Sequence, residues 1–278
     1  MAHTTYKECF VVSAFTDRPF SGNPAAVCLL DQPRPDTWLQ AVAADFNLSE
    51  TAFLLPLASG RWQLRWFTPT VEVDLCGHAT LASAHVLWRE KRIATEVLEF
   101  ETRSGVLTAQ QRNGQLGNGQ QTDGQIALDF PASELQPVTL QPHWQDAVQG
   151  KAINAVRGRQ DLLLELQTEQ QVRDFAPDFA AIKQLPARGL IITARSQSGD
   201  ADFVSRFFAP GVGVDEDPVT GSAHCILGPY WGQQLSKTTL RGHQVSRRGG
   251  FVGVELHGAR LNLIGSAITT LRGTLHVD

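Results

Sequence analysis

A thiol, a glycine and an imidazole follow one another in the stretch DLCGHATLASAH, residues 74–85. Cys76, Gly77 and His78 stand directly before a run of small and apolar residues, a pattern typical of a strand that turns into a buried helix. A thiol at the start of a helix can have a lowered pKa. A histidine there stays neutral more readily, because the helix dipole disfavours the imidazolium. The stretch therefore predicts a packed cysteine or an acid–base thiol at Cys76, and a hydrogen-bonding or proton-handling role for His78.

A metal site is a third interpretation of the same stretch. It would combine His78 with His85 and His224, but these three histidines lack any recognised ligand spacing. We therefore expect no metal, and we expect His85 in the core or behind the site.

Two further stretches carry carboxylates where chemistry could use them. In VDEDPVTGSAH, Asp215, Glu216 and Asp217 precede a helix, and three acids exceed what the helix dipole or a cap needs. One of them is expected to face a binding site. In FNLSETAF, Glu50 stands at the start of a strand among apolar neighbours. This placement makes Glu50 a candidate general base whose pKa is raised by its surroundings.

The cysteine stretch and the acidic stretch belong to an internal repeat. RWFTPTVEVD at 65–74 and RFFAPGVGVD at 206–215 share six of ten residues at an offset of 141. After an insertion of three residues, the motif CGHA at 76–79 matches TGSA at 220–223. The sequence therefore predicts two copies of one unit: strand, proline turn, acidic residue, glycine, helix.

The helix of each copy begins after a glycine and with small residues, which permits close packing inside a sheet. Its first backbone N–H groups are unpaired, and its dipole is positive at that end. Two such ends facing each other across a pseudo-two-fold cleft would bind an anionic small molecule. Pro229 falls inside the second helix and is expected to kink it or to end its first segment.

The remaining chain consists of many strand-like segments and few helices. Residues 36–46 (DTWLQAVAADF) have the pattern of an amphipathic helix, and a polar Gly/Gln/Asn-rich stretch after Thr108 is typical of a loop or a domain junction. Strands and helices do not alternate strictly. This order favours the α+β class over a doubly wound sheet.

Composition narrows the class of protein further. The 278 residues are 42% hydrophobic and 19% charged, with a net charge of −4 and no clustered basic face, which argues against a nucleic-acid-binding protein. No apolar run is long enough to span a membrane, and the N-terminus lacks a signal-peptide pattern. We therefore expect a cytoplasmic protein whose four cysteines are free thiols, with Cys9 and Cys28 buried in strands.

Together these motifs resemble the PhzF-like family, the phenazine-biosynthesis isomerases and their relatives, and more distantly diaminopimelate epimerase. The motifs that carry the resemblance are FTDRPFSGNPAAV (15–27), LSETAF (48–53), FTPTVEVDLCGHATLASAHVL (67–87) and DEDPVTGSAHCILGPYW (215–231). The resemblance implies two pseudo-symmetric halves, each a curved mixed or antiparallel sheet around a central helix, with the active site between them. The halves would comprise residues 1–120 with about 268–278, and residues 121–267. Family members are commonly homodimers, so a homodimer is expected here.

The resemblance also implies a chemistry, which is a cofactor-free proton shift on a small anionic substrate. Carried over, Glu50 is similar to the catalytic base, and the other polar residues around the reacting carbon would be His78, Asp217 and Ser222. The backbone amides of Gly77 and Gly221 would stabilise developing negative charge. Substrate contacts are further expected from Asn23, Ser49 and Thr220.

Two alternatives stay open from the sequence. The first is a racemase or epimerase that uses Cys76 together with Glu50 or Asp217, although Thr220 stands where a second thiol would be needed. The second alternative is a small-molecule-binding protein that has lost catalysis. No feature of the sequence identifies the substrate.

Overall fold

The computed structural model describes residues 6–91, 93–112 and 124–276. The chain divides into two compact units, residues Met1–Asp129 with Ile264–Asp278 and residues Phe130–Leu263. The C-terminal segment thus belongs to the first unit. The boundary expected between residues 120 and 121 lies outside the described residues, as does most of the polar stretch expected to form a loop.

Unit 1 is a mixed sheet with a helix packed inside it. Its strands pair in the order β18, β1, β2, β3, β4, β6, β7 and β8, and β5 forms a hairpin with β4. The division between the units falls within β8. The elements are β1 Tyr6–Ala14, β2 Asn23–Leu29, α1 Asp36–Phe46, β3 Glu50–Pro56, β4 Trp62–Phe67, β5 Glu72–Val73, α2 Gly77–His85, the π-helical turn η1 Val86–Glu90, β6 Val97–Thr102, β7 Gly105–Arg112, β8 Gln125–Pro131 and β18 Ala267–His276.

Unit 2 repeats this plan. Its strands pair in the order β9, β10, β11, β12, β13, β15 and β16, and β14 pairs with β13. The elements are β9 Gln136–Pro137, α3 Pro142–Ala147, β10 Ala152–Arg157, β11 Leu162–Leu166, α4 Glu169–Arg173, α5 Phe179–Lys183, β12 Leu190–Arg195, β13 Phe203–Ala209, the 3₁₀ turn η2 Pro210–Val212, β14 Val214–Asp217, α6 Gly221–Leu235, β15 Thr239–Gln244, β16 Gly250–His257 and β17 Arg260–Gly265.

The two units share one strand topology. From β1 to β7 in unit 1, successive pairings are antiparallel, parallel, antiparallel, parallel and antiparallel. The same alternation runs from β10 to β16 in unit 2. The α+β class and the duplicated half predicted from the sequence are therefore confirmed.

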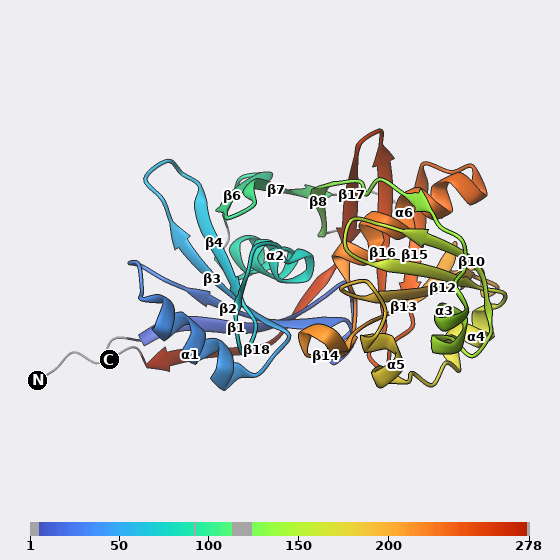
Figure 1. Ribbon diagram of the computed structural model, residues 1–278. Coiled ribbons are helices and arrows are strands. Elements are labelled where there is room, and N and C mark those ends of the chain that lie inside the picture. The colour runs from blue at the N-terminus through green and yellow to red at the C-terminus, as the bar shows by residue number, and fades with distance from the viewer. Residues whose placement is uncertain (1–5, 92, 113–123, 277–278) are drawn as a thin grey trace, which may run out of the picture. The chain divides into compact units, whose positions relative to one another are not determined.

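The central helix of unit 1 is buried on all sides because its residues are small. Figure 1 shows α2 between β1–β3 and the pair β6–β7, and α2 contacts β1, β2, β3, β7 and β18. Seven of its nine residues are buried. Its small side chains let the strands approach closely, and the hydroxyls of Thr80 and Ser83 donate to the carbonyls of Cys76 and Ala79, so the sequence GHATLASAH fits this buried position.

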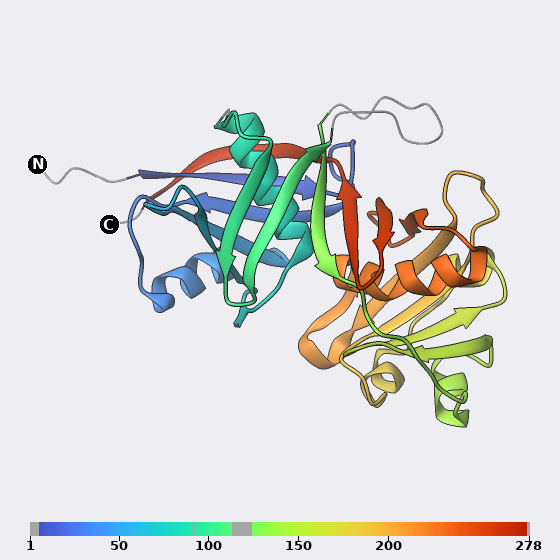
Figure 2. The same ribbon diagram turned by 90° about the horizontal axis from the view of Figure 1, so that it is seen from above.

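The central helix of unit 2, α6, corrects one expectation. Pro229 does not end it, since α6 is a single element of 15 residues, visible in Figure 2. A proline removes the hydrogen bond to the carbonyl four residues earlier, which here is that of Cys225. The backbone N–H of Ser133 donates to that carbonyl at 2.9 Å, so the carbonyl that the proline leaves without a helical donor is satisfied from outside the helix.

A second correction concerns the three residues inserted in the second copy. The sequence match placed them after Asp215, but the strand register pairs Trp66 with Val73 and Phe207 with Asp217. Since Trp66 and Phe207 are equivalent, Val73 corresponds to Asp217. The insertion therefore lies in the turn before β14, and the match of Asp74 with Asp215 is coincidental.

The β4–β5 and β13–β14 hairpins, which precede the central helices, are each held by an arginine–glutamate pair. Arg65 donates two hydrogen bonds to Glu72, at 2.7 and 2.6 Å. Arg206 donates two to Glu216, at 2.7 and 2.9 Å. Bidentate pairs of this kind fix orientation as well as distance, so each hairpin delivers the chain to its central helix in a defined direction.

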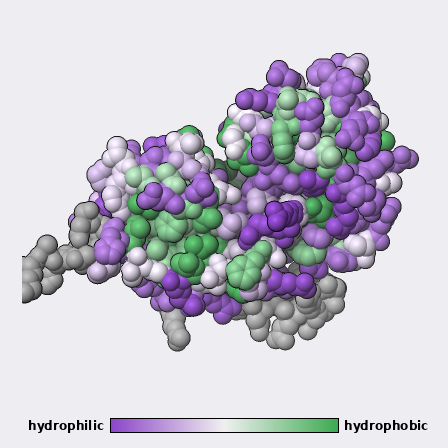
Figure 3. Space-filling model, turned by 90° about the horizontal axis from the view of Figure 1, so that it is seen from below, coloured by the Kyte–Doolittle hydropathy of each residue, from purple (hydrophilic) through white to green (hydrophobic). Residues whose placement is uncertain are grey.

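The outer surface is mixed. Figure 3 shows one face, on which polar residues are widespread and a group of hydrophobic residues lies on the unit that contains the N-terminus. None of the described helices has the length and apolar character needed to cross a membrane. Cys9 and Cys28 are buried, as predicted.

Candidate active site

His78 is the centre of a polar cluster in unit 1. It lies in the first turn of α2 and is 5% exposed. Its Nδ1 atom lies 3.3 Å from Nδ2 of Asn23 and 3.5 Å from Sγ of Cys76. Its Nε2 atom lies 3.2 Å from a carboxylate oxygen of Glu50. The structure thus brings together four residues that the sequence singled out in three separate stretches.

The neighbours of His78 define which nitrogen carries the proton. An amide NH₂ group can only donate, so Nδ1 accepts a hydrogen bond from Asn23. The amide orientation of Asn23 is fixed in turn by Ser49, whose hydroxyl donates to Oδ1 at 3.4 Å. In a neutral ring the proton is then on Nε2, which faces Glu50. Burial lowers the pKa of His78 to about 3, so the ring is neutral near pH 7.

The contact between His78 and Glu50 is close but poorly aligned. Nε2 is fully buried and makes no hydrogen bond of good geometry within the described residues. A buried polar group without an aligned partner costs free energy. This donor therefore keeps hydrogen-bonding capacity that its contact with Glu50 does not use well.

Local backbone geometry places Asn23 and Glu50 at the same end of their strands. β2 and β3 run parallel with Ala25 opposite Glu50, so Asn23 and Glu50 both lie at the amino-terminal end. Gly22 precedes Asn23 with a φ of +65°, and a Cβ at this position would lie 2.2 Å from the carbonyl oxygen of Ala14. Only glycine fits this turn, which delivers Asn23 to its fully buried position.

Glu50, Cys76 and His78 each bring one potential metal-binding atom to within 4.8 Å of the others. The set of metal ligands weighed from the sequence was different, because it combined His78 with His85 and His224. In the structure His85 bonds Thr269 within unit 1, and His224 bonds the carbonyl of Thr220 within unit 2. The ring of His78 contacts both other groups, the thiol through Nδ1 and the carboxylate through Nε2.

Unit 2 carries its own cluster at the start of α6. The hydroxyl of Thr220 donates to Asp217 at 2.5 Å. Gln244 is fully buried and spans the turn between them: its Nε2 donates to the carbonyl of Asp217 at 2.7 Å and to the Thr220 hydroxyl at 3.1 Å. Its Oε1 accepts from the backbone N–H of Thr220 at 2.8 Å. The Asp217 carboxylate is therefore held in a rigid turn.

Ser222 lies in the first turn of α6 and has a charged neighbour. Nη2 of Arg188 donates to its hydroxyl at 3.0 Å. The same guanidinium donates to both carboxylate oxygens of Asp161, at 2.9 and 2.6 Å. Gly77 and Gly221 begin α2 and α6, and neither helix has a side-chain N-cap bond, so their first amides keep the capacity to bind an anion.

Arg188, Asp161 and Gln244 were not identified from the sequence. The signal for Arg188 is present but depends on strand register: the pairings of β3 with β4 and of β12 with β13 make Glu50 equivalent to Gly189. Arg188 thus stands where the first copy has Ser49. A comparison of residue identities does not reveal that equivalence, because β3 and β12 share no sequence motif.

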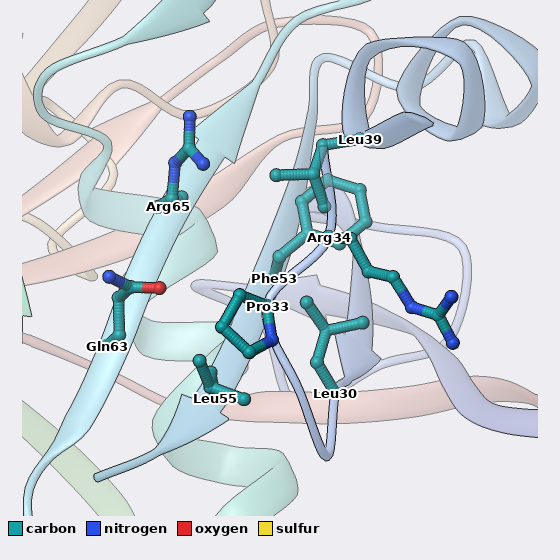
Figure 4. Close-up of a pocket in the computed structure, with 8 residues that line it drawn as sticks. All are labelled: Leu30, Pro33, Arg34, Leu39, Phe53, Leu55, Gln63 and Arg65. Atoms are coloured by element: carbon teal, nitrogen blue, oxygen red, sulfur yellow. The ribbon is translucent and has the colours of Figure 1, made fainter. Parts of the chain in front are cut away.

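One hollow in unit 1 is separate from these clusters. Its cavity volume is about 30 Å³, and its lining combines polar side chains with apolar ones that include Leu30, Leu39, Phe53 and Leu55. Figure 4 shows Arg65 and Gln63 on one of its sides and the guanidinium of Arg34 pointing away on the other. None of its lining residues is a predicted site residue, and Arg65 is already engaged by Glu72 and Asp36. The hollow is a gap beside α1.

Comparison with known proteins identifies the family. The family model described as phenazine biosynthesis-like protein matches residues 12–273. A protein of Halalkalibacterium halodurans named as an uncharacterized isomerase is 47% identical over 270 residues, which cover 96% of this chain and 97% of that protein. The crystal structure of a PhzF-family phenazine biosynthesis protein from Enterococcus faecalis is 40% identical with a TM-score of 0.91, and the match covers 98% of this chain and 100% of that one.

A more distant likeness concerns the fold alone. The structure of a hydroxyproline epimerase from Agrobacterium vitis, with bound trans-4-hydroxy-L-proline, is 11% identical with a TM-score of 0.61 and covers 100% of this chain and 94% of that one. The duplicated plan of a sheet around a central helix is therefore shared with epimerases. With its family model and its close relatives in agreement, the chain belongs to the phenazine biosynthesis-like, or PhzF, family, and we class it with the isomerases of that family.

Proposed function

We propose that the protein is a cofactor-independent isomerase that shifts a proton on a small carboxylate-bearing metabolite, with Glu50 as the general base. One observation carries this proposal: the Glu50 carboxylate lies 3.2 Å from a buried, neutral imidazole, His78. A carboxylate is a suitable base for a carbon acid that a neighbouring carboxylate or double bond activates.

The role of His78 follows from its protonation state. With a pKa of about 3, it is not an imidazolium near pH 7 and has no acidic proton to transfer. Its Nε2–H is instead a hydrogen-bond donor, and a substrate oxygen would satisfy it. His78 thus stabilises negative charge that develops on the substrate when Glu50 removes the proton.

A second carbon of the substrate must then receive a proton from another group. Asp217 is our candidate for this acid, because Thr220 and Gln244 hold it in place. In the complete step Glu50 takes a proton from one carbon, the electron pair moves along the substrate, and Asp217 in its protonated form gives a proton to a second carbon. Exchange with solvent then removes the proton from Glu50 and restores the one on Asp217. The Gly77 and Gly221 amides and the Ser222 hydroxyl stabilise the anion, and Asn23 and Ser49 contact polar substituents.

The comparison of the two units argues against a racemase whose two bases stand at equivalent positions of the two copies. A racemase places one base on each side of the reacting carbon. The positions equivalent to Cys76 and Glu50 in unit 2 are Thr220 and Gly189, and neither can act as a base near pH 7. Asp217, the proposed acid in unit 2, stands at the position equivalent to Val73 of unit 1.

Solvent isotope exchange tests the proposal. The protein would be incubated in D₂O with a panel of small carboxylic acids that contain an activated C–H bond, including β,γ-unsaturated acids and trans-4-hydroxy-L-proline. We expect a positional isomer that carries deuterium, detected by proton NMR. An epimer as the only product would support the racemase alternative. A compound that binds tightly without any exchange would support the inactive binding protein instead.

A further inference from the structure

The pair formed by Glu50 and His78 in unit 1 has a counterpart of opposite charge in unit 2. Strand register makes Glu50 equivalent to Gly189, and the helix starts make His78 equivalent to Ser222. In place of a carboxylate beside an imidazole, unit 2 has the Arg188 guanidinium beside a hydroxyl, 3.0 Å apart.

Packing prevents unit 2 from carrying a base at the equivalent position. A Cβ at residue 189 would lie 2.4 Å from the ring of Phe207. The Arg188 guanidinium lies over the same ring, with 5.6 Å between its central carbon and the ring centroid. Phe207 therefore excludes a side chain at residue 189 and supports the cation next to it.

Asp161 fixes the direction of that cation. Its side chain is 2% exposed and accepts two hydrogen bonds from Arg188, whose side chain is 35% exposed. A bidentate pair with a buried carboxylate leaves the guanidinium little rotational freedom. Nη2 of Arg188 donates one hydrogen bond to Asp161 and another to the Ser222 oxygen.

We infer that Arg188, oriented by Asp161, is a positioning residue for Ser222. Because the Ser222 oxygen accepts a hydrogen bond from a cation, its own proton is donated in another direction and its O–H bond is more polar. Ser222 is thereby set as a hydrogen-bond donor for an anionic group of the substrate. The role of this donor rests on the proposed function, whereas the coupling between Arg188 and Ser222 is a property of the folded protein.

A thiol in place of the hydroxyl measures the coupling without any substrate. In a Cys225→Ala background, Ser222→Cys introduces a thiol whose alkylation by iodoacetamide is followed against pH by peptide mass spectrometry. A nearby guanidinium stabilises a thiolate, so Arg188→Gln should raise the midpoint of the alkylation profile by about one pH unit. The matched control is Arg157→Gln, since Arg157 belongs to the same unit but bonds the carbonyl of Pro186.

The outcomes separate clearly. An unchanged midpoint in a folded Arg188→Gln variant overturns the inference, and so does an equal shift in the Arg157→Gln control. If Arg188→Gln does not fold, Arg188→Lys carries the test: it keeps the charge but loses the planar fork, and we expect a rise of about half a pH unit. An unchanged midpoint in that variant also overturns the inference.

A second measurement links the pair to turnover. With a substrate found by isotope exchange, Arg188→Lys should lower kcat about tenfold with KM nearly unchanged, and it should cause no further loss in a Ser222→Ala background. Independent, multiplying losses would mean that Arg188 acts without Ser222. Full activity of Glu50→Gln would refute the proposed base and leave the thiol titration as it is, so the two ideas fail separately.

Discussion

His78 shows how one buried side chain ties separate sequence motifs together. The FSGNP turn supplies Asn23, the LSETAF strand supplies Ser49 and Glu50, and the helix start supplies His78 itself. The residue types and their positions at strand and helix starts were readable from the sequence. The tautomer was not, because it depends on which atom of Asn23 faces Nδ1.

Cys76 distinguishes the isomerase from the thiol-dependent alternative. Its sulfur lies 3.5 Å from Nδ1 of His78, whereas Glu50 contacts Nε2. We expect Cys76→Ala to keep the exchange rate within about threefold, a loss of no more than about 0.7 kcal/mol in barrier terms. Measurement of deuterium incorporation by this variant checks the prediction, with Cys9→Ala as a control for a cysteine outside the cluster. A loss of a hundredfold or more would instead support the racemase.

At the scale of elements, the central helices depend on how closely they approach the sheet. A Cβ at Gly228 of α6 would lie 2.7 Å from a methyl group of Val254 in β16. Sequence patterns indicated small residues along both helices but gave no distances. They also missed β15, whose sequence TLRGHQ has few β-branched or aromatic residues.

Gly228→Ala should therefore destabilise the protein although alanine is the better helix former. The gain in helix propensity is about 1 kcal/mol, whereas overpacking in a close-packed core costs about 1–3 kcal/mol. We expect a net loss in the free energy of unfolding of up to about 2 kcal/mol by urea titration. Gly211→Ala is the control, because no atom lies within 4 Å of a Cβ there and its stability should change little. A more stable Gly228→Ala variant would contradict the packing described for α6.

Pro229 illustrates why a local rule failed. The rule that proline ends a helix assumes that the freed carbonyl has no other donor. Here the backbone N–H of Ser133, almost a hundred residues away in the chain, donates to that carbonyl. No local pattern encodes such a contact, so the continuity of α6 could not be predicted from the sequence around Pro229.

At the scale of the whole molecule, duplication explains what the sequence revealed and what it concealed. The match between the copies predicted the repeated unit, and the strand pairings of both units confirm it. The match between the copies did not place the three-residue insertion of the second copy correctly, because Val and Asp recur by chance around the turn. The divergence of the copies, with Glu50 in one and Arg188 beside Gly189 in the other, became visible only through strand register. Homodimer formation stays a prediction.

Buried histidines in both units make the stability depend on pH. Burial lowers the pKa of His78 to about 3 and that of His224 to about 4. At pH values between these lowered pKa values and the ordinary histidine pKa of 6.5, the unfolded chain binds protons that the folded protein does not. Their contribution to stability is therefore complete above pH 6.5 and is lost as the pH falls towards 4, by up to about 1.4 kcal/mol per pH unit for each histidine.

His224→Gln tests this dependence, since glutamine does not titrate. Urea unfolding between pH 7.5 and 4.5 should show a slope against pH that is smaller by about 1 kcal/mol per pH unit than that of the wild type. His257→Gln serves as the control, because the side chain of His257 is 59% exposed. An unchanged slope for His224→Gln would show that this histidine is not held neutral by burial.

The most direct test of the account is the exchange rate of Glu50→Gln. The variant keeps the size of the side chain and the contact with His78 but cannot accept a proton. With a substrate identified by isotope exchange, we predict that Glu50→Gln loses deuterium incorporation by at least about a thousandfold, about 4 kcal/mol, while its urea unfolding midpoint stays close to that of the wild type. The control is Glu134→Gln, outside both clusters, which should exchange normally. Undiminished exchange by a folded Glu50→Gln variant would contradict the assignment of Glu50 as the base.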